Sequence, residues 1–123
     1  MKVLVCGGRD YDDIESVYSQ LSALRAEHND VFVIHGGCVT VDPRTGSKRG
    51  ADYLAGAWAH CHSRPCAEVK ADWDKFGCAA GPIRNKWMLL LEPDLVLAFP
   101  GGKGTAHMVS IARKAGIEVR EVE

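Results

Sequence analysis

Three glycine-rich turns are the parts of this chain best suited to bind an anion. Gly7-Gly8, Gly36-Gly37 and Gly101-Gly102-Lys103-Gly104 each stand directly behind a short apolar run. Glycine accepts unusual backbone angles and leaves room for a ligand beside the main chain. The third turn runs straight into a helical pattern, whose first N–H groups are free to bind a phosphate, and Thr105 adds a hydroxyl. The sequence therefore predicts a phosphate site at the third turn.

Two arginines and a tryptophan are the next candidates for ligand binding. Arg9 follows the first glycine turn and could bind a phosphate through two N–H groups, or it is a solvated loop charge. Trp73 could stack on a base or serve as a packing residue. Arg84 is expected in the first turn of a helix, where a cation is electrostatically unfavourable, so we expect it to have a compensating role.

Three aspartates are candidate catalytic carboxylates at the same edge. Asp10 follows the first glycine turn, Asp52 begins a predicted helix, and Asp72 ends a predicted strand. Each has a structural alternative: Asp52 as a charge that meets a helix N-terminus, and Asp10 and Asp72 as turn or capping acids. The residue types alone leave both readings open.

Other ligand motifs have the wrong spacing. Gly102–Thr105 lacks the first glycine and the spacer of a Walker A loop, and His107 stands where a dinucleotide fingerprint needs glycine. His60, Cys61, His62 and Cys66 do not form a recognised zinc ligand set, because adjacent helical residues point in different directions. We expect no metal site and no cofactor.

The elements that position these residues alternate along the chain. Apolar runs predict strands at 2–6, 31–35, 65–71, 95–99 and 117–122, and helical spacing predicts helices near 14–24, 51–61, 83–91 and from about 105 onward. This order is typical of an α/β fold: a single Rossmann-like, doubly wound parallel sheet of about five strands with helices on both faces. We expect one domain over residues 1–123.

The stretch Cys38–Gly50 fits no element of this pattern. It contains turn residues and positive charges but has no periodicity, so we expect a loop insertion that is either a binding lid or a mobile segment.

Composition limits the classes of partner. Fifteen Lys and Arg against sixteen Asp and Glu give a net charge of -1, which provides no overall basic field for nucleic acid or an anionic membrane. The apolar runs are far shorter than the roughly 20 residues of a membrane span. Five cysteines, an odd number, favour reduced thiols and a cytoplasmic location.

The ordered motifs also resemble a known family. The series resembles the small stand-alone members of the SLOG superfamily, in its YpsA/YspA-related branch, and runs through Gly7-Gly8-Arg9-Asp10, His35-Gly36-Gly37, Gly50-Ala51-Asp52, Ala71-Asp72-Trp73, Ala79-Ala80-Gly81-Pro82-Ile83-Arg84-Asn85 and Pro100-Gly101-Gly102-Lys103-Gly104-Thr105. That superfamily unites the Rossmann-like domain of the DNA-processing protein DprA with the LOG cytokinin-activating enzymes. The resemblance implies a Rossmann-like fold.

The resemblance also bears on function. LOG enzymes cleave the N-glycosidic bond of nucleoside 5′-monophosphates, and they use an arginine and a glutamate that stands shortly after the Pro-Gly-Gly-x-Gly-Thr loop. Arg84, followed by Asn85, resembles that arginine. Here His107 and Met108 stand where that glutamate is expected. A glycosidic transition state needs a nearby carboxylate. We therefore expect a module that binds a nucleotide-derived phosphate, with a LOG-like phosphoribohydrolase as the alternative and a homo-oligomer left open.

Overall fold

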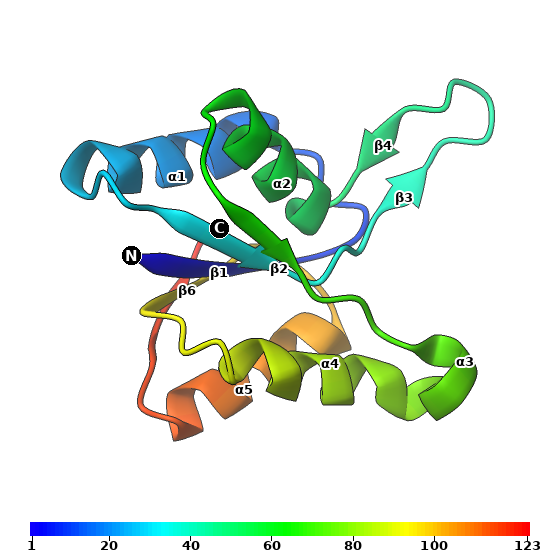
Figure 1. Cartoon of the computed structure of the whole chain (residues 1–123). Coiled ribbons are helices and arrows are strands. Elements are labelled where there is room, and N and C mark those ends of the chain that lie inside the picture. Colours follow the sequence, from blue (N-terminus) through cyan, green and yellow to red (C-terminus); the bar gives the residue numbers. More distant parts are fainter.

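The computed structural model describes all residues, 1–123, and has at its centre a five-stranded sheet in which every strand pairing is parallel. The strands are β1 (Lys2–Cys6), β2 (Phe32–His35), β5 (Cys66–Glu68), β6 (Leu95–Ala98) and β7 (Glu118–Glu121). They lie in the order β5-β2-β1-β6-β7 (Figure 1). The chain therefore winds outward in both directions from β1, and the order reverses between β1 and β6.

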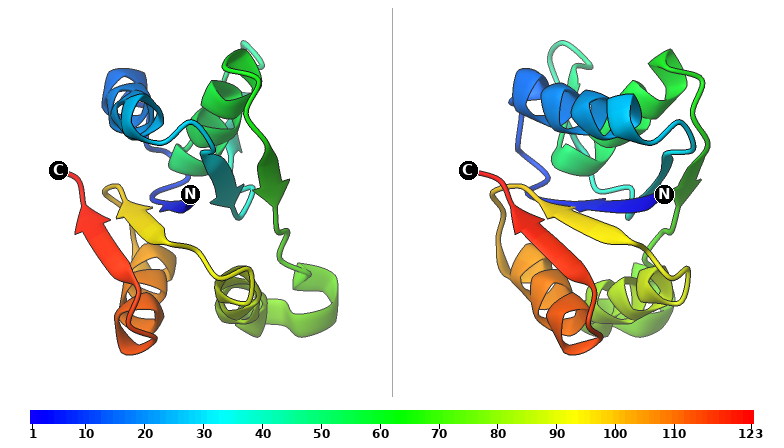
Figure 2. Two further views of the ribbon diagram at one scale, coloured as in Figure 1. Left: turned by 60° about the vertical axis from the view of Figure 1, so that its left-hand side comes forward. Right: turned by 90° about the vertical axis from the view of Figure 1, so that its left-hand side faces the viewer.

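Helices cover both faces of this sheet (Figure 2). Helices α1 (Ile14–Glu27) and α2 (Ala51–Cys61) lie on one face, and α4 (Ala80–Leu89) and α5 (Lys103–Lys114) lie on the other. The short helix α3 (Trp73–Phe76) and the 3-10 turn η1 (Gly77–Ala79) lead into α4. The predicted α/β, Rossmann-like arrangement is confirmed. None of the helices has the length and hydrophobicity that a membrane span requires.

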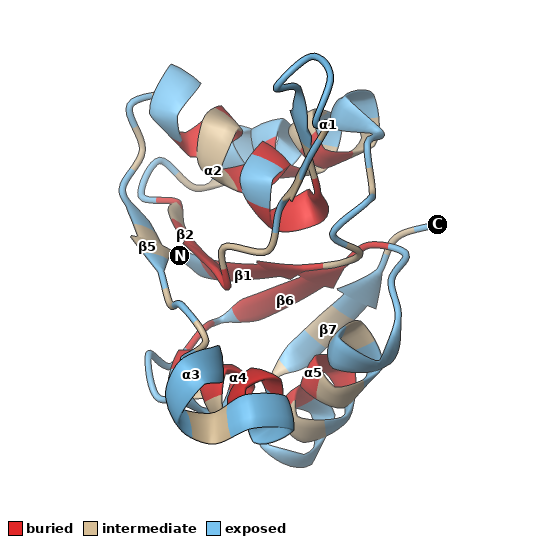
Figure 3. Cartoon of the chain, turned by 90° about the vertical axis from the view of Figure 1, so that its right-hand side faces the viewer, coloured by how far each residue is buried: buried red, intermediate tan, exposed pale blue.

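The core lies on both faces of the central strands, and Figure 3 shows most of β1 and β6 as buried. Successive side chains of a strand point to opposite faces of the sheet. Val3 and Val5 pack with residues of α1 and α2, while Leu4 and Cys6 pack with residues of α4 and α5. Trp58 is fully buried, as its helical spacing predicts, and donates from Nε1 to Ser22 Oγ at 3.0 Å. Both faces of β1 and β6 are therefore buried against helices.

Trp87 does not belong to this core. Its position among apolar residues of a helix predicts burial, but 40% of its surface is exposed and its ring meets Phe76 edge-on. The prediction is wrong because Trp87 lies on the outer side of α4, toward α3.

Two segments contain more structure than the sequence predicts. Within Cys38–Gly50, β3 (Thr40–Val41) pairs antiparallel with β4 (Lys48–Arg49), so this segment forms a short hairpin. Helix α4 begins at Ala80 rather than near Ile83, because η1 feeds directly into it. Pro82 is then the third helical residue, where a missing N–H breaks no helical hydrogen bond.

Candidate ligand-binding site

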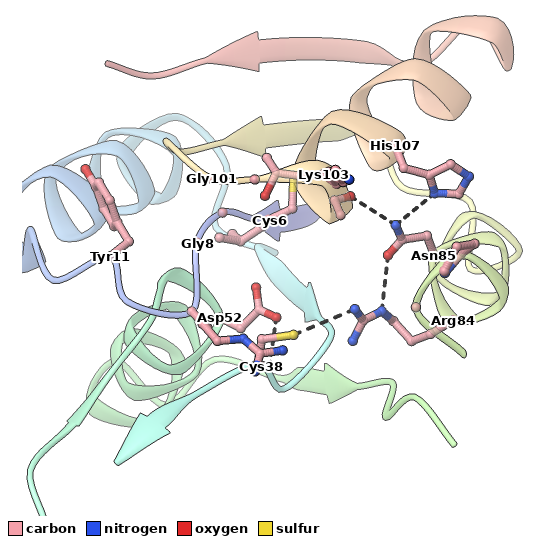
Figure 4. A pocket seen from close by; sticks show the side chains of 18 of the residues that line it. Cys6, Gly8, Tyr11, Cys38, Asp52, Arg84, Asn85, Gly101, Lys103 and His107 are labelled. Carbon is pink, nitrogen blue, oxygen red and sulfur yellow. Dashed lines mark hydrogen bonds between the residues drawn. The ribbon is translucent and has the colours of Figure 1, made fainter. Parts of the chain in front are cut away.

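A cavity of about 890 Å³ opens at the carboxyl ends of β1 and β6, where the strand order reverses. Ligands bind at such switch points in open α/β sheets. The predicted site residues that line it are Gly7, Gly8, Arg9, Asp10, Asp52, Trp73, Arg84, Asn85, Gly101, Gly102, Lys103, Gly104 and Thr105. Residues from five separate segments of the chain therefore meet in one cavity (Figure 4).

The first and third glycine turns touch each other at the switch point. The Gly8 N–H donates to the Pro100 carbonyl at 2.8 Å. A Cβ on Gly101 would lie 2.7 Å from the Gly8 nitrogen and would also collide with Thr105 Oγ1. Gly101 must therefore remain glycine for the two turns to pack, and this contact fixes where α5 begins.

The N-terminus of α5 presents free donors to the cavity. Gly102 is the N-cap residue and no side chain caps this helix. The first helical hydrogen bond is donated by Ala106 to Gly102, so the N–H groups of Lys103, Gly104 and Thr105 have no partner within the protein. These amides and the positive end of the helix dipole form an environment suited to an anion.

Arg84 is buried rather than placed on a helix surface. It is the fifth residue of α4, beyond the first turn, and 7% of its surface is exposed. Its Nη1 donates to the Gly36 carbonyl at 2.7 Å, and its Nε donates to Asn85 Oδ1 at 3.1 Å. Only Nη2 lacks an oxygen acceptor and lies 3.7 Å from Cys38 Sγ. Arg84 thus joins α4 to the turn after β2.

Asn85 extends this connection to α5. Its Oδ1 accepts from Arg84, so its Nδ2 points the other way and donates to the Gly104 carbonyl at 3.2 Å. The same nitrogen lies 3.1 Å from His107 Nδ1. Since an amide nitrogen only donates, His107 Nδ1 is the acceptor in this pair. A continuous set of hydrogen bonds therefore runs from Gly36 through Arg84 and Asn85 to the start of α5. Figure 4 shows the part of this set around Arg84, Asn85 and His107.

Asp52 is a carboxylate on the cavity wall with 5% of its surface exposed. Its Oδ2 accepts from the N–H groups of Gly36 at 3.2 Å and Cys38 at 3.0 Å. Burial raises the pKa of Asp52, while the Cys38 N–H and the charges of His35 and Arg84 act in the opposite direction. Burial likewise lowers the pKa of His35, whose Nδ1 accepts from Gly37.

The other two predicted carboxylates have different surroundings. Asp10 lines the cavity but pairs with Arg49 of the hairpin, with Oδ1 3.2 Å from Nη2. Asp72 lies outside this cavity and is the N-cap of α3, where Oδ1 accepts from Lys75 N at 3.1 Å. The structure brings Asp10 and Asp52 together and leaves Asp72 apart.

A smaller cavity of about 290 Å³ adjoins the first one. Gly36 and Gly37 line this second space together with Lys70, and it shares Arg9, Trp73 and Arg84 with the larger cavity. Trp73 is 52% exposed, so its ring is accessible at the mouth of both. The predicted site residues Gly36 and Gly37 therefore line the adjoining cavity and not the larger one.

The cavity also contains residues that the sequence analysis did not single out as ligand-binding residues. They include Cys6, Tyr11, Cys38 and His107. Cys6 immediately precedes the first glycine turn and Cys38 follows the second, so adjacency to those turns is the signal that could have identified them. Burial raises the pKa of the Cys6 thiol to about 12, with the Asp52 charge adding to the effect. Burial therefore disfavours the thiolate form of Cys6, which is the nucleophilic form.

Comparisons with known proteins agree with this architecture. The chain is 35% identical over 126 residues to the Gene 61 protein of Mycobacterium phage D29, covering 96% of this chain and 93% of that protein. It superposes on the Moco carrier protein from Chlamydomonas reinhardtii with a TM-score of 0.67 and 21% identity, over 98% of this chain and 75% of that one. It superposes on the C-terminal domain of the PF1911 hydrogenase from Pyrococcus furiosus with a TM-score of 0.51 and 21% identity, over 98% and 90% of the two chains. Both structural likenesses concern the fold.

The family is identified at the N-terminal unit, which contains β1, the first glycine turn, α1 and the second glycine turn. The model of the YspA, cpYpsA-related SLOG family matches residues 1–43, which span all four of these features. With the relative that matches over nearly its whole length, this match confirms the resemblance carried by the motif series, and the chain belongs to the YspA, cpYpsA-related SLOG family.

Proposed function

We propose that this protein binds a nucleotide or a nucleotide-derived phosphate in the larger cavity, with the phosphate over the start of α5. The observation that carries this proposal is the set of unpartnered N–H groups of Lys103, Gly104 and Thr105 on the cavity wall. Backbone amides at a helix N-terminus bind phosphate through hydrogen bonds and the helix dipole.

The cations around the cavity support an anionic ligand. Arg9 and Lys103 line the cavity and neither forms an ion pair within the protein. We assign both the role of neutralising the phosphate, and we assign Trp73, exposed at the cavity mouth, the role of stacking on the base. Arg84 acts differently, because its Nε and Nη1 are engaged: it holds the Gly36 turn in place.

Kinship and fold are consistent with a binding role. Membership of the SLOG family and the similarity in fold to the Moco carrier protein both fit a module that holds a small molecule. No glutamate stands two or three residues after Thr105, and His107 lines the cavity there. Binding tolerates this difference better than glycosidic cleavage does, because cleavage requires a positioned carboxylate.

A LOG-like phosphoribohydrolase is the second candidate. It is favoured by one observation, the carboxylate of Asp52 on the cavity wall. In that case Asp52 replaces the absent glutamate. Release of free base from nucleoside 5′-monophosphates would favour the hydrolase, and its absence would favour the binding module.

Thermal unfolding with ligand present tests the binding proposal. A ligand at one hundred times its Kd stabilises the folded state by about 2.7 kcal/mol. Adenosine 5′-monophosphate and other nucleotides should raise the Tm, while adenosine should have little effect. Equal shifts for the nucleoside and its monophosphate, or no shift across a nucleotide panel, would contradict the phosphate site.

A further inference from the structure

The two oxygens of Asp52 have different surroundings. Oδ2 accepts two backbone N–H groups, from Gly36 and Cys38, and Oδ1 has no hydrogen-bond partner. No fully shielded side-chain oxygen or nitrogen in this protein lacks a partner, so Oδ1 keeps contact with the cavity. Figure 4 shows Asp52 pointing into the cavity from α2, across from Gly101 and Lys103.

Oδ1 is a carboxylate oxygen that has no partner within the protein and is not fully shielded from the cavity. The turn after β2 does not require this oxygen, because Oδ2 alone accepts both of its N–H groups. Oδ1 is therefore an acceptor available to a ligand.

The chemistry of Oδ1 is opposite to that of the α5 amides. The amides donate and favour a negative charge, whereas a carboxylate oxygen accepts and repels a negative charge. Asp10, the other acid on the wall, is exposed and already paired with Arg49. The cavity thus has an anion-binding end at α5 and an acceptor end at Asp52.

We infer that Asp52 is a specificity-determining residue whose Oδ1 accepts a hydrogen bond from a neutral hydroxyl or amino group of the ligand, so that the ligand is a phosphorylated sugar or nucleotide and not a simple or condensed phosphate. This inference rests on the proposed function, since it assumes that the phosphate lies at α5. The raised pKa of Asp52, caused by burial, agrees with a carboxylate that a donor group would stabilise in its charged form.

The donor could belong to the sugar or to the base, and three probes separate these sources. Inorganic phosphate offers neither group, ribose 5-phosphate offers sugar hydroxyls alone, and 2′,3′-dideoxyadenosine 5′-monophosphate offers the amino group of the base without ribose hydroxyls. Calorimetry measures their Kd values for the wild-type protein and for Asp52→Asn. An asparagine oxygen still accepts from Gly36 and Cys38, while its NH2 group replaces the free acceptor with a donor.

The expected result is a selective loss. Asp52→Asn should weaken binding of ribose 5-phosphate or of the dideoxynucleotide at least tenfold, which is about 1.4 kcal/mol, and should leave the Kd of inorganic phosphate unchanged or lower. The probe that is weakened identifies the donor. Asp12→Asn is the matched control, because Asp12 is exposed and its side chain makes no hydrogen bond or ion pair; it should leave all three Kd values unchanged.

Other outcomes overturn the inference. Equal weakening of all three probes by Asp52→Asn means that Asp52 only supports the turn, and no weakening means that no ligand group contacts it. The wild-type protein alone gives a second test: at least one of the two organic probes should bind tenfold more tightly than inorganic phosphate, and equal affinities overturn the inference without the variant. Failure of all three probes to bind the wild-type protein rejects the phosphate site itself, a result distinct from either outcome above.

Discussion

Asp52 and Arg84 hold the same residue from opposite sides. Asp52 Oδ2 accepts from the Gly36 N–H at 3.2 Å, and Arg84 Nη1 donates to the Gly36 carbonyl at 2.7 Å. A side chain at Gly36 would collide with the Arg84 guanidinium, so only glycine allows this arrangement. One peptide segment after β2 is thereby fixed between α2 on one face of the sheet and α4 on the other.

Replacing Arg84 with alanine should destabilise the fold. The change removes the donor to the Gly36 carbonyl and the donor to Asn85 Oδ1, and leaves both acceptors without these bonds. A loss of about 2 to 4 kcal/mol in the free energy of unfolding is expected. Urea denaturation measures it, with Arg25→Ala, an exposed arginine on α1, as the matched control. Equal stability of the two variants would show that the buried contacts of Arg84 contribute little.

Replacing Gly101 with alanine should separate the first and third glycine turns. The new Cβ would meet the backbone nitrogen of Gly8 at 2.7 Å, and a backbone atom moves only if the turn moves. We expect a loss of roughly 2 kcal/mol or more in stability. The matched control is Gly104→Ala, where a Cβ meets nothing within 4 Å and helix propensity favours alanine by up to about 1 kcal/mol. A Gly101→Ala protein as stable as Gly104→Ala would contradict the close packing of the two turns.

Helices and strands with strong hydrophobic periodicity could be predicted from the sequence, and elements of only two to four residues could not. Ala51–Cys61 has the bounds that its spacing predicts, because its apolar stripe covers the sheet. The strands β3 and β4 have two residues each, too few to show an alternation. The helix α3 contains only four residues, and its N-cap is Asp72, for which the sequence leaves both a catalytic and a capping role open.

The candidate site could be predicted in part, for a related reason. Glycine turns at strand ends identify the edge of the sheet, and this edge holds the cavity. The burial of Arg84 could not be predicted, since it depends on how closely Gly36 approaches α4 in three dimensions. The same is true of the contact between Asn85 and His107, whose positions lie on different helices.

The stability of the protein should depend on pH through Asp52. Burial raises the pKa of this carboxyl in the folded state above its ordinary value of 3.8, so the folded protein binds a proton more tightly than the unfolded chain. The stabilisation that the protonated Asp52 carboxyl gives the folded state is therefore present below pH 3.8, and it is lost as the pH rises through the folded-state pKa of Asp52. Asp52→Asn removes this penalty, so its stability relative to the wild-type protein increases as the pH rises.

Urea denaturation at pH 4, 5, 6 and 7 checks this dependence. Asp52→Asn should gain stability relative to the wild-type protein as the pH rises, and Asp12→Asn should not. A constant difference across this range, or a difference that shrinks with rising pH, would show that the carboxyl pKa is not raised in the folded protein.

Incubation with nucleoside 5′-monophosphates should release free base only at the background rate. Phosphate binding and positioning do not by themselves stabilise the positive charge that develops on the sugar in glycosidic cleavage. Chromatography of the released base measures this. Robust release by the wild-type protein that is abolished in Asp52→Asn, and retained in Asp12→Asn, would establish the hydrolase instead of the binding module.

The central claim is that a phosphate lies on the free amides at the start of α5, and amide NMR of the 15N-labelled protein tests it most directly. Adenosine 5′-monophosphate should shift the N–H resonances of Lys103, Gly104 and Thr105, which have no acceptor within the protein, and should leave Gly116 at the other end of that helix unmoved. Adenosine at the same concentration should leave the three α5 amides in place. Binding of the nucleotide without movement of these resonances, or equal movement with adenosine, would contradict the account.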